Sequence, residues 1–77
     1  MTLGERLKAL RMARDWTQQD LSDRAGVRQP LISQLETGRK KDTLALIVQR
    51  LARALGVTVE ELLDGDREED LLATPYA

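Results

Sequence analysis

Hydrogen-bonding side chains gather in one short segment of the chain, between residues 28 and 37. Gln29 and Gln34 carry amides, while Arg28 and Ser33 add a guanidinium and a hydroxyl. A Gln amide can pair with the N6 and N7 atoms of adenine, and a guanidinium can pair with the O6 and N7 atoms of guanine. A run of cations suited to phosphate groups follows directly: Arg39, Lys40 and Lys41. These residue types favour binding to the bases and phosphates of nucleic acid.

The composition excludes several kinds of catalytic and metal site. The 77 residues include no His and no Cys, which excludes thiol nucleophiles, disulfides, His general bases and the usual zinc sites. We therefore expect no metal, no other cofactor and no enzyme activity. No apolar run approaches the roughly 20 residues of a membrane span, and the first residues lack a signal-peptide core. The expected location is the cytoplasm, with no membrane contact.

The apolar residues favour an all-α fold. Leu and Ala dominate them, with no Phe, one Trp and one Tyr, whereas strands prefer β-branched and aromatic residues. Caps and glycines divide the chain into five predicted helices: 3–14, 17–26, 29–36, one from 42 or 43 to 56, and one that begins at the cap Thr58. These helices are expected to form one compact domain, 1–63. An acidic tail follows, 64–77, and could hold a short sixth helix within 67–73.

A tight turn joins the second and third predicted helices. Gly26 tolerates the positive φ that such a turn needs, and Ser22 is small where the two helices must cross. Five apolar residues fall on the inner side of this corner: Leu21, Ala25, Val27, Ile32 and Leu35. The outer side is left to Gln29, Pro30, Ser33, Gln34 and Thr37. Arg28 offers no acceptor to the helix that it precedes, and a residue that breaks a local rule is a candidate for function.

The segment WTQQDLSDRAGVRQPLISQLETGR resembles the phage-repressor (Cro-like) helix-turn-helix DNA-binding domains. The resemblance rests on the apolar positions, on Gly26 and on the Glu36-Thr37-Gly38 end, and it extends over about residues 3–63. It implies that the helix at 29–36 is a recognition helix and that the partner is double-stranded DNA. It also implies base contacts by Arg28, Gln29, Pro30, Ser33 and Gln34.

The same resemblance implies roles for three more residues. Gln18 would touch a phosphate and brace Gln29 against a base. Arg11 and Glu36 would form a partly buried ion pair between the first and third helices, as part of the scaffold. The full set of expected phosphate contacts is Gln18, Arg14, Thr37, Arg39, Lys40 and Lys41.

Two residues depart from the family pattern. Arg28 stands where a small hydroxyl residue usually caps the recognition helix. Pro30 follows Gln29 and has no polar group, so it can only pack, for example on a thymine methyl. Trp16 is an aromatic residue that could stack, but we expect it to cap the core between the first two helices.

The fourth predicted helix offers a surface for a homodimer. Helix-turn-helix domains read few base pairs, so dimers on palindromic half-sites about one DNA turn apart are the usual solution. At about 100° per residue, one stripe of this helix points inward: Leu44, Val48, Leu51, Ala52 and Leu55. Leu46 points the opposite way and Ile47 lies on the border. With the next helix they form the predicted dimer interface: Leu46, Ile47, Val59, Leu62 and Leu63.

The leading hypothesis is a sequence-specific transcription regulator, a dimeric repressor or autoregulator of a palindromic operator. One alternative is an activator such as the controller proteins of restriction–modification systems, with Asp20 and Asp23 facing RNA polymerase. Another is an antitoxin whose acidic tail binds a toxin.

The charge is divided between the two ends of the chain. The formal net charge is −1, which alone argues against a nucleic-acid binder. Residues 1–58 hold 11 basic and 6 acidic side chains, whereas residues 59–77 hold 1 basic and 7 acidic ones. We therefore expect the basic body to face DNA and the acidic tail to lie away from it.

Overall fold

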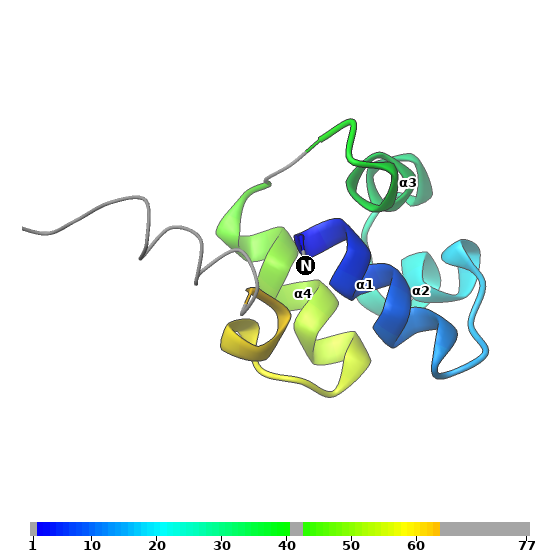
Figure 1. Ribbon diagram of the computed structural model, residues 1–77. Helices are drawn as coiled ribbons and strands as arrows, with labels where there is room; N and C mark the ends of the chain where they lie inside the picture. The colour runs from blue at the N-terminus through cyan, green and yellow to red at the C-terminus, as the bar shows by residue number, and fades with distance from the viewer. Residues whose placement is uncertain (1, 41–42, 64–77) are drawn as a thin grey trace, which may run out of the picture.

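The computed structural model describes residues 2–40 and 43–63, and over these ranges it is all-α (Figure 1). Its helices are α1 (Leu3–Met12), α2 (Gln18–Ala25), α3 (Gln29–Thr37) and α4 (Ala45–Leu55), and a short helical segment follows at residues 59–63. This confirms the all-α class and the five helices. Over the described ranges, none of the helices has the length and apolar character to cross a membrane. The predicted sixth helix, 67–73, lies outside the described residues.

Capping residues fix where α1 and α2 begin. Thr2 and Thr17 each accept a hydrogen bond from the backbone N–H three residues on, and the Glu5 and Asp20 carboxylates accept from the N–H groups of Thr2 and Thr17 in return. These reciprocal bonds satisfy N–H groups that have no partner within the helix. At its other end α1 stops at Met12, earlier than predicted, because a turn follows in which Asp15 has a φ of 56°.

The start of α4 differs from the prediction. The helix begins at Ala45, and Leu44 caps it in an extended conformation with φ −63° and ψ 145°. Leu44 is 74% exposed, so its predicted place in the inward stripe is wrong. The reason is that an extended residue does not follow the 100° spacing of the helix after it. The rest of the predicted stripe is buried: Val48, Leu51, Ala52 and Leu55.

One core holds the helices together. All five residues predicted for the inner corner are buried, and Leu3 and Leu7 of α1 pack into the same cluster. Leu62 is also part of this core, with 1% of its surface exposed. Its predicted place in a dimer interface is therefore wrong, because the segment at residues 59–63 folds back against α1. A hydrogen bond of 3.1 Å from Arg6 Nε to the Glu61 carbonyl marks that contact.

Gly4 lets α1 approach α3 closely. A Cβ atom on Gly4 would lie 1.8 Å from the Leu35 carbonyl oxygen, which real Cβ atoms essentially never do. The backbones of the two helices thus meet at a point where only glycine fits. This approach sets the distance between α1 and α3, and so it sets the place of the polar side chains between them.

Candidate nucleic-acid interface

The corner between α2 and α3 is fixed by backbone and side-chain hydrogen bonds. Gly26 ends α2 with a φ of 68°, and its N–H donates to the Ser22 carbonyl at 2.9 Å. The Ser22 hydroxyl donates to the Val27 carbonyl at 2.6 Å, and Arg50 Nη1 of α4 donates to the Gly26 carbonyl at 3.2 Å. The sequence indicated only the small size of Ser22, and not this bond across the turn. Together these contacts hold α3 at one angle to α2.

The outward side of α3 carries the predicted base-contacting residues. Pro30 and Gln34 are exposed, while Gln29 and Ser33 are half-buried. Arg28 precedes the helix in an extended conformation, is exposed and makes no capping hydrogen bond with its side chain. The structure therefore brings the five residues together along one side and at the start of α3.

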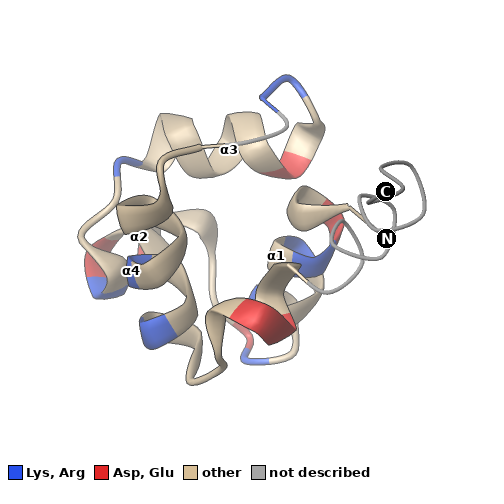
Figure 2. Cartoon of the chain, turned by 90° about the vertical axis from the view of Figure 1, so that its left-hand side faces the viewer, with Lys and Arg blue, Asp and Glu red and all other residues tan. Residues whose placement is uncertain are grey.

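Basic residues lie at both ends of α3 (Figure 2). Arg28 lies at the N-terminal end. At the other end Gly38 closes the helix with a φ of 82°, and the exposed side chains of Arg39 and Lys40 follow. The Lys40 N–H donates to the Gln34 carbonyl at 3.0 Å, which ties this turn to the helix. Thr37 is exposed beside it, and Lys41 lies outside the described residues.

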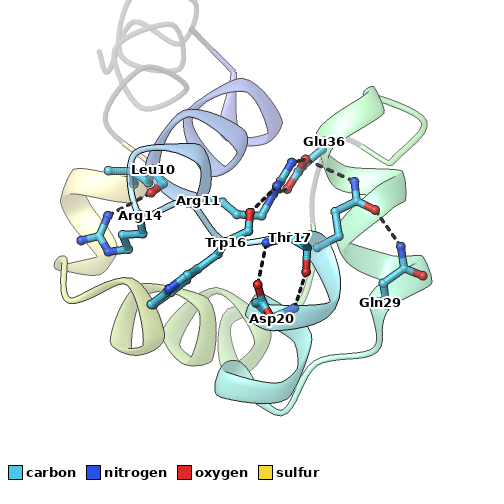
Figure 3. A network of polar contacts seen from close by, with 9 residues as sticks. Leu10, Arg11, Arg14, Trp16, Thr17, Asp20, Gln29 and Glu36 are labelled. Carbon is cyan, nitrogen blue, oxygen red and sulfur yellow. Dashed lines mark hydrogen bonds and ion pairs between the residues drawn. The ribbon is translucent and has the colours of Figure 1, made fainter.

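A chain of polar contacts leads from the interior to the start of α3 (Figure 3). Arg11 binds Glu36 through two bonds, Nε to Oε2 at 2.8 Å and Nη2 to Oε1 at 2.9 Å. Gln18 Nε2 donates to the same Glu36 Oε1 at 3.3 Å. Gln29 Nε2 in turn donates to Gln18 Oε1 at 2.7 Å. The resemblance implied the pair of Arg11 with Glu36 and the contact of Gln18 with Gln29. Nothing in the sequence indicated the bond from Gln18 to Glu36, which connects the two.

The ion pair of Arg11 and Glu36 is partly buried, and both oxygens of the Glu36 carboxylate accept hydrogen bonds. The Glu36 side chain is 2% exposed and that of Arg11 is 11% exposed. Arg11 Nη1 also donates to the Trp16 carbonyl at 2.7 Å. The hydrogen bond to Glu36 raises the pKa of Arg11, so the guanidinium stays charged. Removing one partner of such a pair would leave an uncompensated buried charge, at a cost of about 3–5 kcal/mol.

The Arg14 side chain is bonded to backbone carbonyl groups of α1 and α4. Its guanidinium donates to the Leu10 carbonyl at 3.0 Å and to the Leu55 carbonyl at the end of α4. In Figure 3 it lies well apart from Gln29. These bonds correct the predicted phosphate contact by Arg14: they satisfy carbonyl groups that have no partner within their helices.

Trp16 is partly buried against the core, as the sequence predicts. The Arg24 guanidinium lies 4.3 Å from the centre of its ring, and that of Arg14 lies 5.8 Å away. Both contacts are of the cation–π kind, which stabilises by roughly 0.5–1 kcal/mol at exposed sites. Trp16 therefore joins α1, α2 and their connecting turn, and its stacking partners come from this chain.

The described residues offer no alternative site for a metal. Over residues 2–40 and 43–63, His, Cys, Asp and Glu nowhere come together in a group of three or more that could hold an ion. The same part of the chain has no buried side-chain N or O atom without a hydrogen-bond partner.

Comparison with solved structures shows the same arrangement of helices elsewhere. The SinR protein/SinI protein complex matches 88% of this chain and 66% of that chain, with a TM-score of 0.80 and 25% identity. The restriction-modification controller protein C.AhdI from Aeromonas hydrophila matches 79% of this chain and 91% of that chain, with a TM-score of 0.74 and 28% identity. A structure of SinR in complex with DNA, 23% identical, shares the fold at a TM-score of 0.77.

Sequence comparison identifies the family. The HTH-type transcriptional regulator DdrOP3 of Deinococcus deserti is 40% identical over 65 residues, which are 84% of this chain and 50% of the relative. The chain thus spans about half the length of that curated relative. That relative is named as a transcriptional regulator. A family model described as helix-turn-helix matches residues 7–62, more than half of the chain, and the chain therefore belongs to the helix-turn-helix family.

Proposed function

We propose that this chain is a sequence-specific transcription regulator that binds double-stranded DNA. The observation that carries the proposal is the Gln29 amide, which a hydrogen bond of 2.7 Å to Gln18 holds at the start of α3. The first residues of a recognition helix are those that meet base edges in the major groove. The relation to DdrOP3, which is named as a transcriptional regulator, supports the same function.

In this proposal α3 enters the major groove with its outward side. Bases are contacted by Arg28, Gln29, Pro30, Ser33 and Gln34. Phosphates are contacted by Gln18, Thr37, Arg39, Lys40 and Lys41. Phosphate contacts fix position and supply affinity, whereas base contacts supply sequence preference. Arg14 is left out because its guanidinium is bonded within the domain.

We also propose that the protein acts in the cytoplasm as a homodimer that represses from a palindromic operator, its own promoter included. The exposed apolar residue Leu46 lies on α4 with 55% of its surface accessible, and the partly buried Ile47, Val59 and Leu63 complete the interface. Leu44 precedes them and is also exposed, which enlarges the apolar surface beyond the predicted set. Two copies would place two α3 helices on successive major grooves, which roughly doubles the length of sequence read.

The experiment that tests this function is selection of bound DNA from a pool of duplexes with a randomised core. A regulator of this kind enriches one motif, and a dimer enriches it as two inverted halves. Specific complexes bind about 10³-fold or more tighter than random DNA, so the enrichment is large. A protein that enriches no motif from the pool at moderate salt does not have the proposed function.

A second candidate, a transcriptional activator, is favoured by the likeness to the controller protein C.AhdI, 28% identical over 91% of that chain. Asp20 and Asp23 of α2 would then face RNA polymerase. Transcription in vitro from a promoter beside the selected operator separates the two modes. Added protein lowers the transcript under repression and raises it under activation.

A further inference from the structure

We propose that Glu36 is a specificity-determining residue that acts at a distance: through Gln18 it fixes which way the Gln29 amide points, and so it selects adenine as the base read there. The inference rests on the proposed function. It gives Glu36 a part in reading sequence, beyond the scaffold role that the resemblance implies for its ion pair with Arg11.

The first step is the charge on Glu36. Its carboxylate is bound by Arg11 through both oxygens, with the side chain 2% exposed. An ionised carboxylate only accepts hydrogen bonds. Gln18 lies against Glu36 Oε1 at 3.3 Å and must therefore offer its NH₂ group there. An amide that turns its NH₂ inward turns its oxygen outward, so Gln18 Oε1 faces Gln29.

The second step passes this orientation to Gln29. Because Gln18 presents an acceptor, Gln29 must give it an N–H, and the distance from Gln29 Nε2 to Gln18 Oε1 is 2.7 Å. Gln29 is left with its Oε1 and one N–H. Adenine offers an N6–H donor beside the N7 acceptor, which matches that pair, whereas guanine offers two acceptors and would face the amide oxygen with O6. The charge on Glu36 thus excludes the reversed orientation of the Gln29 amide, in which its oxygen would face Gln18 and its N–H groups would face the two acceptors of guanine.

The test compares base preference in the wild-type protein and in Glu36→Gln. Both are used to select from the same duplex pool with a randomised core, and Gln29→Ala identifies the base pair that Gln29 contacts. Arg11 donates to both oxygens of Glu36 and Gln18 donates to one of them, so in Glu36→Gln a single acceptor remains and the Gln18 amide is no longer held in one orientation. We expect the preference for adenine over guanine at that pair to fall by about tenfold or more, with the other positions of the motif unchanged.

Loss of stability is controlled for separately. Val48→Ala opens a cavity in the core of α4, away from these contacts, and it lowers stability without a change of the acceptor at residue 36. We expect it to keep the wild-type motif. Where circular dichroism shows that Glu36→Gln does not fold, the double variant Arg11→Met with Glu36→Leu replaces the pair by apolar side chains, a change that buried pairs often tolerate. It removes the acceptor and should also lose the preference for adenine.

The outcomes are separable. An unchanged adenine preference in a folded Glu36→Gln protein overturns the inference, and so does an equal loss of preference in Val48→Ala. If the wild-type protein enriches no motif at all, the proposed function fails, and the inference that rests on it fails with it.

Discussion

The Gln29 amide is bonded to its own chain and, in the proposed function, also contacts a base, and this double use makes its removal informative. Gln29→Ala should lower the difference in binding free energy between operator and random DNA by about 1–3 kcal/mol, because a paired base contact is lost. Lys40→Ala should instead weaken binding to both DNAs about equally and flatten the salt dependence, because it removes a phosphate contact. Both affinities are measured by fluorescence anisotropy over a range of salt concentrations.

Gln19→Ala is the matched control for the amide. Gln19 is exposed on α2, where its amide donates to Asp23 at 2.9 Å. It should bind operator and random DNA as the wild-type protein does. If Gln29→Ala preserves the difference as well, α3 is not the element that reads sequence.

Residue types and spacing were enough to predict roles for the amides, the cations and the turn glycine, because those roles depend on each residue's own chemistry and its neighbours in sequence. They did not indicate the bond from Gln18 to Glu36, which joins side chains 18 positions apart. Nor did they show that Arg14 bonds to a carbonyl 41 positions away at the end of α4. A charged residue on an exposed helix face and one that reaches across to another helix look alike until the helices are packed.

Between elements, the contact of α1 with α3 at Gly4 gives a sharp prediction. Gly4→Ala would drive a Cβ into the Leu35 carbonyl, and neither backbone can move without shifting its helix. We expect the free energy of unfolding in urea to fall by about 3 kcal/mol. Lys8→Ala, at an exposed position of the same helix, should change it by less than about 0.5 kcal/mol. A Gly4→Ala protein as stable as the wild type would contradict this packing.

The capping box of α2 predicts a dependence of stability on pH. Hydrogen bonds from the Thr17 backbone and side chain lower the pKa of Asp20 below its ordinary value of 3.8. A carboxyl whose folded-state pKa is lowered stabilises the fold above its unfolded-state pKa, and this contribution is lost as the pH falls through the folded-state pKa. Between pH 6 and acid pH, the free energy of unfolding in urea should therefore fall less in Asp20→Asn than in the wild-type protein.

Asp23→Asn provides the comparison for that titration. Asp23 is an exposed acid on the same helix, outside the capping box. Its variant controls for the loss of one negative charge from the same helix. Equal pH profiles for all three proteins would contradict the lowered pKa of Asp20 in the folded state.

Helix starts were predictable where a cap is local and not where it depends on packing. Thr2 and Thr17 are cap residues that lie close in sequence to the N–H groups they accept from, so both helix starts can be predicted locally. The start of α4 has no side-chain cap, and Leu44 is extended there. Gly4 gave no sign of its role, because the atom that excludes a Cβ belongs to a residue far along the chain.

For the molecule as a whole, the exposed apolar residues on α4 predict its assembly. Leu46→Glu places a charge in the proposed interface and should shift a dimer to monomer in sedimentation velocity, with unchanged helical content by circular dichroism. The matched control is Met12→Glu, since Met12 is 57% exposed on α1 and Leu46 is 55% exposed. Met12→Glu should remain dimeric.

Dimerisation that survives Leu46→Glu would place the interface elsewhere. The division of charge bears on the same question, since the chain carries its basic excess in residues 1–58 and its acidic excess in residues 59–77. Phosphate attracts the first part and repels the second, which fits the proposed interface near α4 because that interface would leave the basic part free to face DNA.

In the proposed function, the side chains of α3 differ in whether they are bonded to the rest of the chain, and this difference has a consequence for how the protein can evolve. Among the described residues, the side chains of Arg28, Ser33 and Gln34 form no hydrogen bond with the rest of the chain, whereas Gln29 is bonded to Gln18. Mutations at the three untethered positions can change the preferred operator while the fold keeps its stability. A change at Gln29 needs matching changes along the chain of contacts behind it. Duplicated copies of the gene could therefore acquire separate operators through a few independent substitutions, while the base pair read by Gln29 remains common to all of them.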